Sequence, residues 1–403
     1  MTRDDPALDR TDDGLAPRTS LSPPARACVT SACPAPDRAL STTLFRVVLR
    51  TVEAKPAEAA ETAATRAPTD DAAATPANPR VTRVTEALVS TLVALEGYAR
   101  IRGTMIAGAR TPDGIDPDPR VESDRLFCSR DVALLASDYL FARAHHTVAA
   151  APLDADVTVA AFRTVSHASR ALVTDFSEAL DHSDETPDPE GTLPAERPPT
   201  AAVLCTCALS LGAIAGGIDS PAREYLEEYG RALGTVVDAL EGDRVAGSGR
   251  SAETAGPLGE GETLRIERTL SRLLRGDAPR PMTNGPVTDR STDRLEDALD
   301  AAARALEALE AESEAITGSV ERAGTEWRRA PSGEHASTAI PPSTTATRLV
   351  ERLRRPLSWL EGELGLEDVA GRRAGDDSDD GTGGGGDPDP DDDGDTDDGG
   401  RRG

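Results

Sequence analysis

The stretch from Pro199 to Asp243, PTAAVLCTCALSLGAIAGGIDSPAREYLEEYGRALGTVVDALEGD, decides the fold. Its first part, Thr200–Ile218, carries no charged residue and is built more from Ala, Gly, Ser, Thr and Cys than from Leu or Ile. A helix that is apolar on every side either lies in the centre of a bundle or crosses a membrane, which takes about 20 residues. The small residues and the absence of aromatic anchors favour the buried helix. We therefore expect no membrane span.

Helical periodicity continues on both sides of this stretch. In Val81–Ile106, for example, the apolar residues recur three and four positions apart, as on one face of a helix. Strand signals are nearly absent, so the sequence predicts an all-α bundle. The helices expected in it cover 81–106, 126–150, 157–180, 200–218, 220–241, 262–274, 293–320 and 344–366.

The composition predicts one folded region between two disordered ends. Residues 1–80 are rich in Pro, Asp and Ala, and we expect them to be mostly disordered, with residues 1–40 unstructured and one possible helix near 44–65. The helical domain is expected over 81–366. Residues 367–403 form a Gly/Asp-rich acidic tail that cannot build a core.

The charge balance is strongly acidic, with 71 acidic against 44 basic residues and a formal net charge of −27. Such a surface repels nucleic acid phosphates, so a nucleic acid partner is not expected. It fits adaptation to a high-salt cytoplasm, where screening removes the self-repulsion. The five cysteines show no metal-ligand spacing and are expected to be free thiols in the cytoplasm.

Two blocks of the sequence resemble the trans-polyprenyl diphosphate synthases. In the first block, Thr200, the small-residue run Leu211–Gly217 and the segment Tyr229–Gly234 fit the family's Lys-Thr, L-G-A-I-x-A-G and Y-G-x-x-L-G frame. In the second block, Leu134–Ala144, LLASDYLFARA, resembles the segment where a Gly-Asp pair begins a buried helix. The resemblance implies an isoprenoid-synthase-type bundle over roughly 84–360.

The charged groups of the family's reaction are missing from the matching positions. The reaction uses two aspartate-rich motifs that hold Mg²⁺ on the diphosphate of an allylic substrate. The family's lysine is replaced by Pro199, and the aspartate pair of the second motif reads Glu241-Gly242. Glu96 matches a glutamate that precedes the first motif, which places Ile106-Ala107 at its aspartate pair.

Weak candidates for relocated metal ligands remain near both motifs. Carboxylates near the first motif lie in a Pro/Gly loop, and those near the second lie at the end of the helix that follows Ser220. For charges at such positions, a solvated loop and a surface helix are the ordinary interpretations. The candidates are Asp113, Asp116 and Asp118 for the first site and Asp238, Glu241 and Asp243 for the second.

We therefore expect a non-catalytic, polyprenyl-synthase-like protein without a cofactor. It would act as a partner subunit of an active prenyl synthase, as a homodimer, or as a holder of an isoprenoid ligand. Two alternatives stay open: an active Mg²⁺-dependent prenyltransferase with relocated ligands, and a structural helical protein without a ligand.

Two glycines in the uncharged helix indicate a close helix contact. Gly212 and Gly216 are four residues apart and share one face. We expect this face to pack against the helix over 126–150, 157–180 or 220–241. Gly216→Leu would then destabilise the fold by about 1–3 kcal/mol.

Overall fold

The structure is a computed structural model that describes residues 21–53, 79–109, 128–181, 200–218, 220–248, 263–278, 289–327 and 343–364. Every regular element in these ranges is an α-helix, so the all-α prediction is confirmed for them. The helices are α1 (Pro23–Ala32), α2 (Leu40–Glu53), α4 (Pro79–Ala109), α5 (Arg130–Ala149), α6 (Ala155–Asp181), α7 (Ala201–Gly216), α8 (Ser220–Ser248), α9 (Thr263–Arg275), α10 (Asp289–Trp327) and α11 (Ser343–Leu364).

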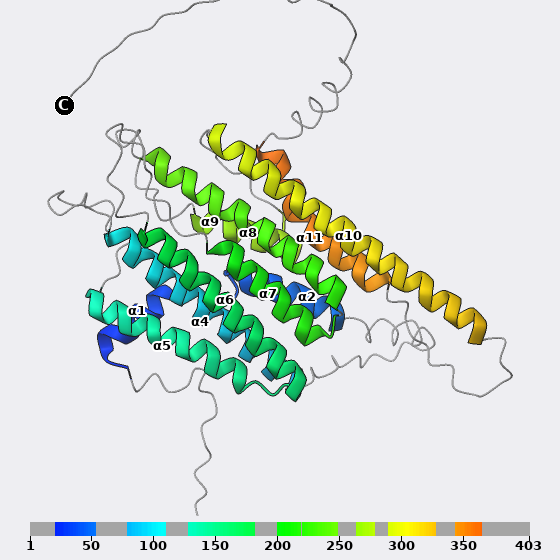
Figure 1. The fold of residues 1–403 in the computed structure, drawn as a ribbon, viewed down its shortest axis with the longest axis horizontal. Helices are drawn as coiled ribbons and strands as arrows, with labels where there is room; N and C mark the ends of the chain where they lie inside the picture. The colour runs from blue at the N-terminus through cyan, green and yellow to red at the C-terminus, as the bar shows by residue number, and fades with distance from the viewer. Residues whose placement is uncertain are drawn as a thin grey trace, which may run out of the picture. The chain divides into compact units, whose positions relative to one another are not determined.

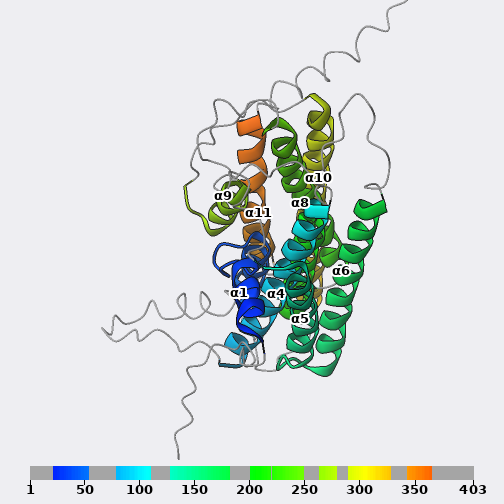
Figure 2. The same ribbon diagram turned by 90° about the vertical axis from the view of Figure 1, so that its left-hand side faces the viewer.

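Most of these helices run roughly alongside one another, with α1 and α5 at one edge and α10 and α11 at the other (Figure 1). Viewed from the side, α1 lies close to α4 and α5, while α6 lies farther out on the other side of α5 (Figure 2). Among the described residues, no helix is both long and apolar enough to cross a membrane.

Helix α7 lies in the core, as its uncharged sequence predicts. Nine of its residues are buried, from Leu204 to Ala213. The helix ends at Gly217, whose φ of 67° lies in the left-handed region that glycine adopts without strain. The next N–H, from Ile218, donates to the Ala213 carbonyl at 2.9 Å and so completes the C-terminal cap. This helix packs against α2, α6 and α8.

The α7–α8 contact is a backbone-to-backbone approach made by two glycines of α8. A Cβ on Gly230 would lie 2.9 Å from the carbonyl oxygen of Cys205, and one on Gly234 would lie 2.3 Å from the Cα of Ala202. These glycines belong to the segment that carries the family resemblance. Their spacing of four residues puts them on one helix face, which explains why the two helices come so close.

The prediction that Gly212 and Gly216 pack against α5, α6 or α8 is wrong. A Cβ on Gly212 would lie 3.0 Å from the Cβ of Val48, and one on Gly216 would lie 3.1 Å from a methyl carbon of Val52. Both valines belong to α2, so this glycine face packs on α2 rather than on α5, α6 or α8. The sequence before residue 81 was expected to be mostly disordered, and α2 was therefore not considered as a partner.

The expectation that residues 1–40 are unstructured is wrong for α1. Ser22 precedes two prolines that occupy the first helical turn, where the missing N–H is harmless. The possible helix near 44–65 is present as α2, which begins earlier, at Leu40; the remainder of that range lies outside the described residues. The helical region therefore includes residues 23–53. The tail over 367–403 also lies outside the described residues.

Helices α8, α10 and α11 form the other side of the bundle. Tyr229 of α8 is fully buried, and its hydroxyl donates to the carbonyl oxygen of Leu353 in α11 at 2.7 Å. A buried phenol needs such a partner, because an unpaired hydroxyl in the core costs about 1–3 kcal/mol. This hydrogen bond fixes the position of α11 along α8.

Candidate functional site

The acidic candidates near the first metal motif, Asp113, Asp116 and Asp118, lie outside the described residues. Near the second motif, Glu241 and Asp243 lie within α8, but their side chains are outside what the structure describes. Within the described part of the chain, no group of three or more His, Cys, Asp or Glu side chains is placed to hold a metal ion.

The carboxylate of Asp238 caps the N-terminus of α7. Its two oxygens accept the backbone N–H groups of Ala201 and Ala202, each at 3.0 Å. The first N–H groups of a helix have no partner within the helix, and the helix dipole favours a negative charge there. Thr200, which precedes the helix, makes no side-chain cap of its own. Asp238 of α8 therefore supplies the cap of α7.

Glu96 is buried in a polar cluster where α2, α4 and α9 meet. It is 5% exposed, accepts the hydroxyl of Ser41 at 2.9 Å, and pairs with Arg100 at 3.0 Å. Arg100 also lies 3.6 Å from Glu267 of α9. A guanidinium between two carboxylates offsets part of their negative charge without a metal ion. Ile106, at the family's aspartate position, is buried among apolar side chains.

The same region surrounds the buried thiol of Cys205. Burial raises its pKa well above the ordinary value, and the negative charges of Asp238, Glu267 and Glu96 raise it further. Carboxylates from α4, α8 and α9 thus converge near one point of the core. There they face a helix N-terminus and Arg100, which offset part of their charge.

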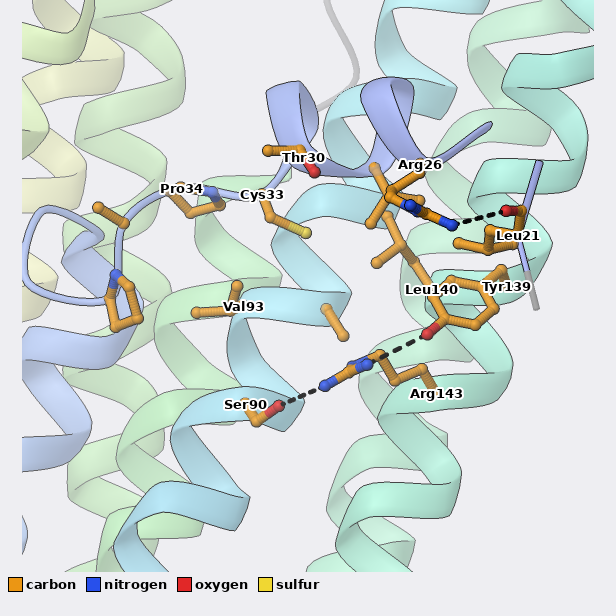
Figure 3. A pocket seen from close by; sticks show the side chains of 14 residues that line it. Leu21, Arg26, Thr30, Cys33, Pro34, Ser90, Val93, Tyr139, Leu140 and Arg143 are labelled. Carbon is orange, nitrogen blue, oxygen red and sulfur yellow. Dashed lines mark hydrogen bonds between the residues drawn. The ribbon is translucent and has the colours of Figure 1, made fainter. Parts of the chain in front are cut away.

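A pocket of about 290 Å³ lies at the edge of the bundle that α1, α4 and α5 share (Figure 3). Its volume is at the lower end of the range for small-molecule sites, which is about 300–1,000 Å³. Most of the wall is apolar, contributed by side chains such as Val29, Val93 and Leu140. The hydroxyls of Thr30, Ser90 and Tyr139 and the guanidinium groups of Arg26 and Arg143 supply the polar atoms.

Arg143 is the charged group inside this pocket. Its side chain comes from α5, and the residue is only 6% exposed. Its guanidinium donates to the hydroxyl of Tyr139 at 3.1 Å and to that of Ser90 at 3.4 Å (Figure 3). Both acceptors are neutral, and no carboxylate of the described residues forms an ion pair with Arg143.

The charge of the pocket is opposite to that of the chain. The pocket lining contains two arginines and no Asp or Glu, whereas acidic residues outnumber basic ones 71 to 44 in the chain. The second arginine, Arg26, is exposed at the rim and donates to the carbonyl oxygen of Leu21 at 3.2 Å. Two guanidinium groups beside an apolar wall can bind an organic anion, with its head at Arg143 and its body against the valines.

Two features of the chain hide this pocket from prediction by sequence. Arg143 stands in the block LLASDYLFARA, but nothing in the sequence marks it as a buried arginine without a carboxylate partner. The opposite wall comes from residues 21–36, which were expected to be unstructured. One usable signal was present, since Ser22 followed by two prolines is typical of a helix start.

Helices α5 and α6 expose several large apolar residues. Among the described residues, all the large apolar side chains that are well exposed lie on these two helices, and Leu135 is 63% exposed. His145 stands between Phe141 and Phe162, with ring centroids 4.6 and 5.6 Å away. The exposed residues are Leu134, Leu135, Phe141, Val159, Phe162, Val173 and Leu180. We call them the α5–α6 face.

The sequence matches no protein-family model, and no curated protein matches it. The likeness to the polyprenyl diphosphate synthases therefore rests on the two sequence blocks around Leu134–Ala144 and Pro199–Asp243.

Proposed function

We propose that this chain is a non-catalytic binding protein that holds an apolar organic anion in the pocket between α1, α4 and α5. The polyprenyl synthase resemblance suggests an isoprenoid phosphate as one member of that ligand class. The observation that carries the proposal is Arg143, a buried guanidinium in an apolar pocket that forms no ion pair with a carboxylate of the described residues.

Burying a charged side chain costs free energy. A guanidinium cannot lose its proton to avoid that cost, so buried arginines are normally paired with an anion. Hydrogen bonds to two neutral hydroxyls compensate it only in part. A ligand carboxylate or phosphate would complete the pair, and its apolar body would cover Val93 and Leu140.

The absence of catalysis is supported by the two carboxylates that lie near the family's metal motifs and are described by the structure. Asp238 holds two N–H groups of α7, and Glu96 is bonded to Ser41 and Arg100. A carboxylate that binds Mg²⁺ must be free to face the ion together with other oxygen ligands. Releasing Asp238 would leave the α7 N-terminus without this cap.

The test is a binding titration of the full chain in molar salt. Calorimetry and the thermal midpoint would be followed with octanoate, geranyl phosphate, inorganic phosphate and octanamide, the neutral counterpart of octanoate. We expect octanoate or geranyl phosphate to bind, and octanamide not to bind. Inorganic phosphate should bind far more weakly than either, because it lacks the apolar body.

Arg143→Met is the decisive variant, because it keeps an unbranched apolar stem and removes the guanidinium charge. It should weaken anion binding at least tenfold. Without ligand it should be as stable as the wild type or more stable, since replacing an uncompensated buried charge by an apolar group is often neutral or stabilising. Arg352→Met, at an exposed position of α11, serves as the matched control. Equal binding by wild type and Arg143→Met would refute the proposal.

A prenyltransferase assay tests the catalytic alternative. The protein would be incubated with Mg²⁺, isopentenyl diphosphate and an allylic diphosphate. We expect no chain extension. Product that is lost in Asp238→Asn, with helix content unchanged, would instead establish an active enzyme.

A partner-subunit role is the second candidate, and the α5–α6 face favours it. The partner we propose is a second copy of this chain, because the exposed charges on the middle turns of the two helices are opposite. Arg163 and Arg170 lie on α6, and Asp138, which also pairs with Arg102 of α4 at 2.8 Å, lies on α5. A two-fold arrangement would set α6 of each copy against α5 of the other.

Light scattering tests this pairing directly. The wild type should have twice the mass of the monomer, and Leu135→Asp should be monomeric with unchanged helix content. A wild type that stays monomeric at all concentrations would exclude the second copy.

A further inference from the structure

Helix α1 covers the pocket but is attached to the bundle by small side chains. Its buried residues are Ala25, Cys28 and Ala32. Burial of so little apolar surface contributes correspondingly little free energy, since the effect scales with the area removed from water. Segments held this weakly open at a lower free energy than the core does. Opening of α1 is therefore a route by which a ligand can enter and leave the pocket.

Cys28 of α1 faces Cys128, which lies directly before Ser129, the residue that caps α5. The two sulfur atoms are 3.1 Å apart. Cys28 is 4% exposed, Cys128 is half-buried, and both are free thiols. A disulfide bond is about 2.05 Å long, so a shift of about 1 Å would allow the bond to form. Cys28 is also one of the three buried residues that hold α1 in place.

We propose that Cys28 and Cys128 form a reversible disulfide that locks α1 over the pocket and slows the exchange of the bound anion. The regulatory half of this inference rests on the ligand pocket proposed above. The disulfide itself depends only on the position of the two thiols.

The oxidant is a small-molecule disulfide. Burial and the contact with Cys128 raise the pKa of the Cys28 thiol to about 12, so the half-buried Cys128 reacts first. Its thiolate attacks one sulfur of the oxidant, forms a mixed disulfide and releases the first small thiolate. Cys28 then attacks the sulfur of Cys128 and expels the second small thiolate. The two small thiolates take up the protons that the two cysteine thiols lose. The oxidant is reduced to two thiols as the protein's thiols are oxidised.

Cys33 provides the internal control. It lines the pocket, and its sulfur lies against α4, 2.9 Å from the place where a Cβ of Gly97 would be. A Cys33→Ser variant should therefore form the Cys28–Cys128 bond as well as the wild type does. Cys28→Ser and Cys128→Ser should not form it.

The first experiment identifies the bond. The full chain would be equilibrated with oxidised glutathione in molar salt, alkylated and digested, and the linked peptides identified by mass spectrometry. We expect a peptide pair that joins Cys28 to Cys128 and disappears on reduction. Amide hydrogen exchange in α1 should slow at least tenfold after oxidation. A Cys28–Cys33 linkage, or no linkage, would overturn the inference.

The second experiment measures how fast octanoate dissociates from the reduced and the oxidised protein. Dissociation should be at least tenfold slower from the oxidised protein, and Cys128→Ser should show no such change. If the bond forms and α1 becomes protected but no anion binds, the proposed function fails while the disulfide stands. If octanoate binds the reduced protein and its dissociation is unchanged by the bond, the regulatory inference fails while the proposed function stands.

Discussion

Gly234 of α8 provides a direct test of how α7 and α8 pack. In a Gly234→Ala variant, the new Cβ would lie 2.3 Å from the Cα and 2.4 Å from the N of Ala202. Non-bonded carbon atoms come no closer than about 3.5 Å without repulsion, so the two helices must move apart by about 1 Å. The obstructing atoms are backbone atoms, which cannot turn aside as a side chain can.

The magnitude follows from three contributions. Overpacking costs about 1–3 kcal/mol, and the better helix propensity of alanine recovers about 1 kcal/mol. Asp238 lies one turn after Gly234 on the same face of α8. The same displacement therefore stretches its two hydrogen bonds to α7, which are 3.0 Å long in the wild type. Hydrogen bonds to a charged group contribute about 1.5–3 kcal/mol each, and part of this is lost. We expect a net loss of about 3 kcal/mol in the free energy of unfolding.

Urea unfolding in molar salt, followed by circular dichroism, measures this loss. At about 2–4 °C per kcal/mol for a domain of this size, the thermal midpoint should fall by about 6–12 °C. Gly362→Ala is the matched control, because a Cβ there meets nothing within 4 Å, and it should not destabilise the protein. A Gly234→Ala variant that unfolds at the urea concentration of the wild type would refute the close α7–α8 contact.

Three further predictions concern polar side chains that are buried or half-buried. Tyr229→Phe removes the hydrogen bond to the Leu353 carbonyl and should lower the unfolding free energy by about 1–2 kcal/mol; an unchanged urea midpoint would contradict this. Asp238→Ala should destabilise the fold by about 2 kcal/mol or more and Asp238→Asn by less, since the amide oxygen can still cap α7; equal losses would argue against the cap. Burial, helped by the negative charge of Glu178, raises the pKa of Asp175 from 3.8 to about 6. Protonation of Asp175 therefore favours the folded state, and this contribution to stability is lost as the pH rises from about 4 to about 6. Asp175→Asn should therefore exceed the wild type in thermal midpoint at about pH 7 but not at about pH 3.5, and a pH-independent difference would exclude this titration.

The helices were predictable where their sequences are periodic. The expected helix over 157–180 is α6, which spans Ala155–Asp181, and that over 262–274 is α9, which spans Thr263–Arg275. Apolar spacing reports the face that a helix buries, but not which helix covers that face. For this reason α7 was placed correctly in the core, while α2, the neighbour of its glycine face, was not foreseen.

The short N-terminal helix shows the limit of composition as a guide. Residues 21–36 are poor in large apolar side chains and rich in proline, which is typical of disorder. Even so, α1 is held by alanines and a cysteine that fit against α4 and α5. Such small side chains leave no periodic signal that stands out from an Ala-rich sequence.

The two regions that could bind a ligand differ in whether their charged side chains have charged partners. In the interior, the carboxylates of Glu96 and Glu267 share Arg100, and that of Asp238 holds the α7 N-terminus, so each of these carboxylates already has a partner. At the edge, the hydrogen bonds of Arg143 within the described part of the chain go to two neutral hydroxyls. A folded chain tolerates a buried charge without a counter-ion only at a cost in stability, and such costs accumulate at functional sites. Among the described residues, the surroundings of Arg143 are therefore the better candidate for ligand binding, and the charge of Arg143 favours an anion.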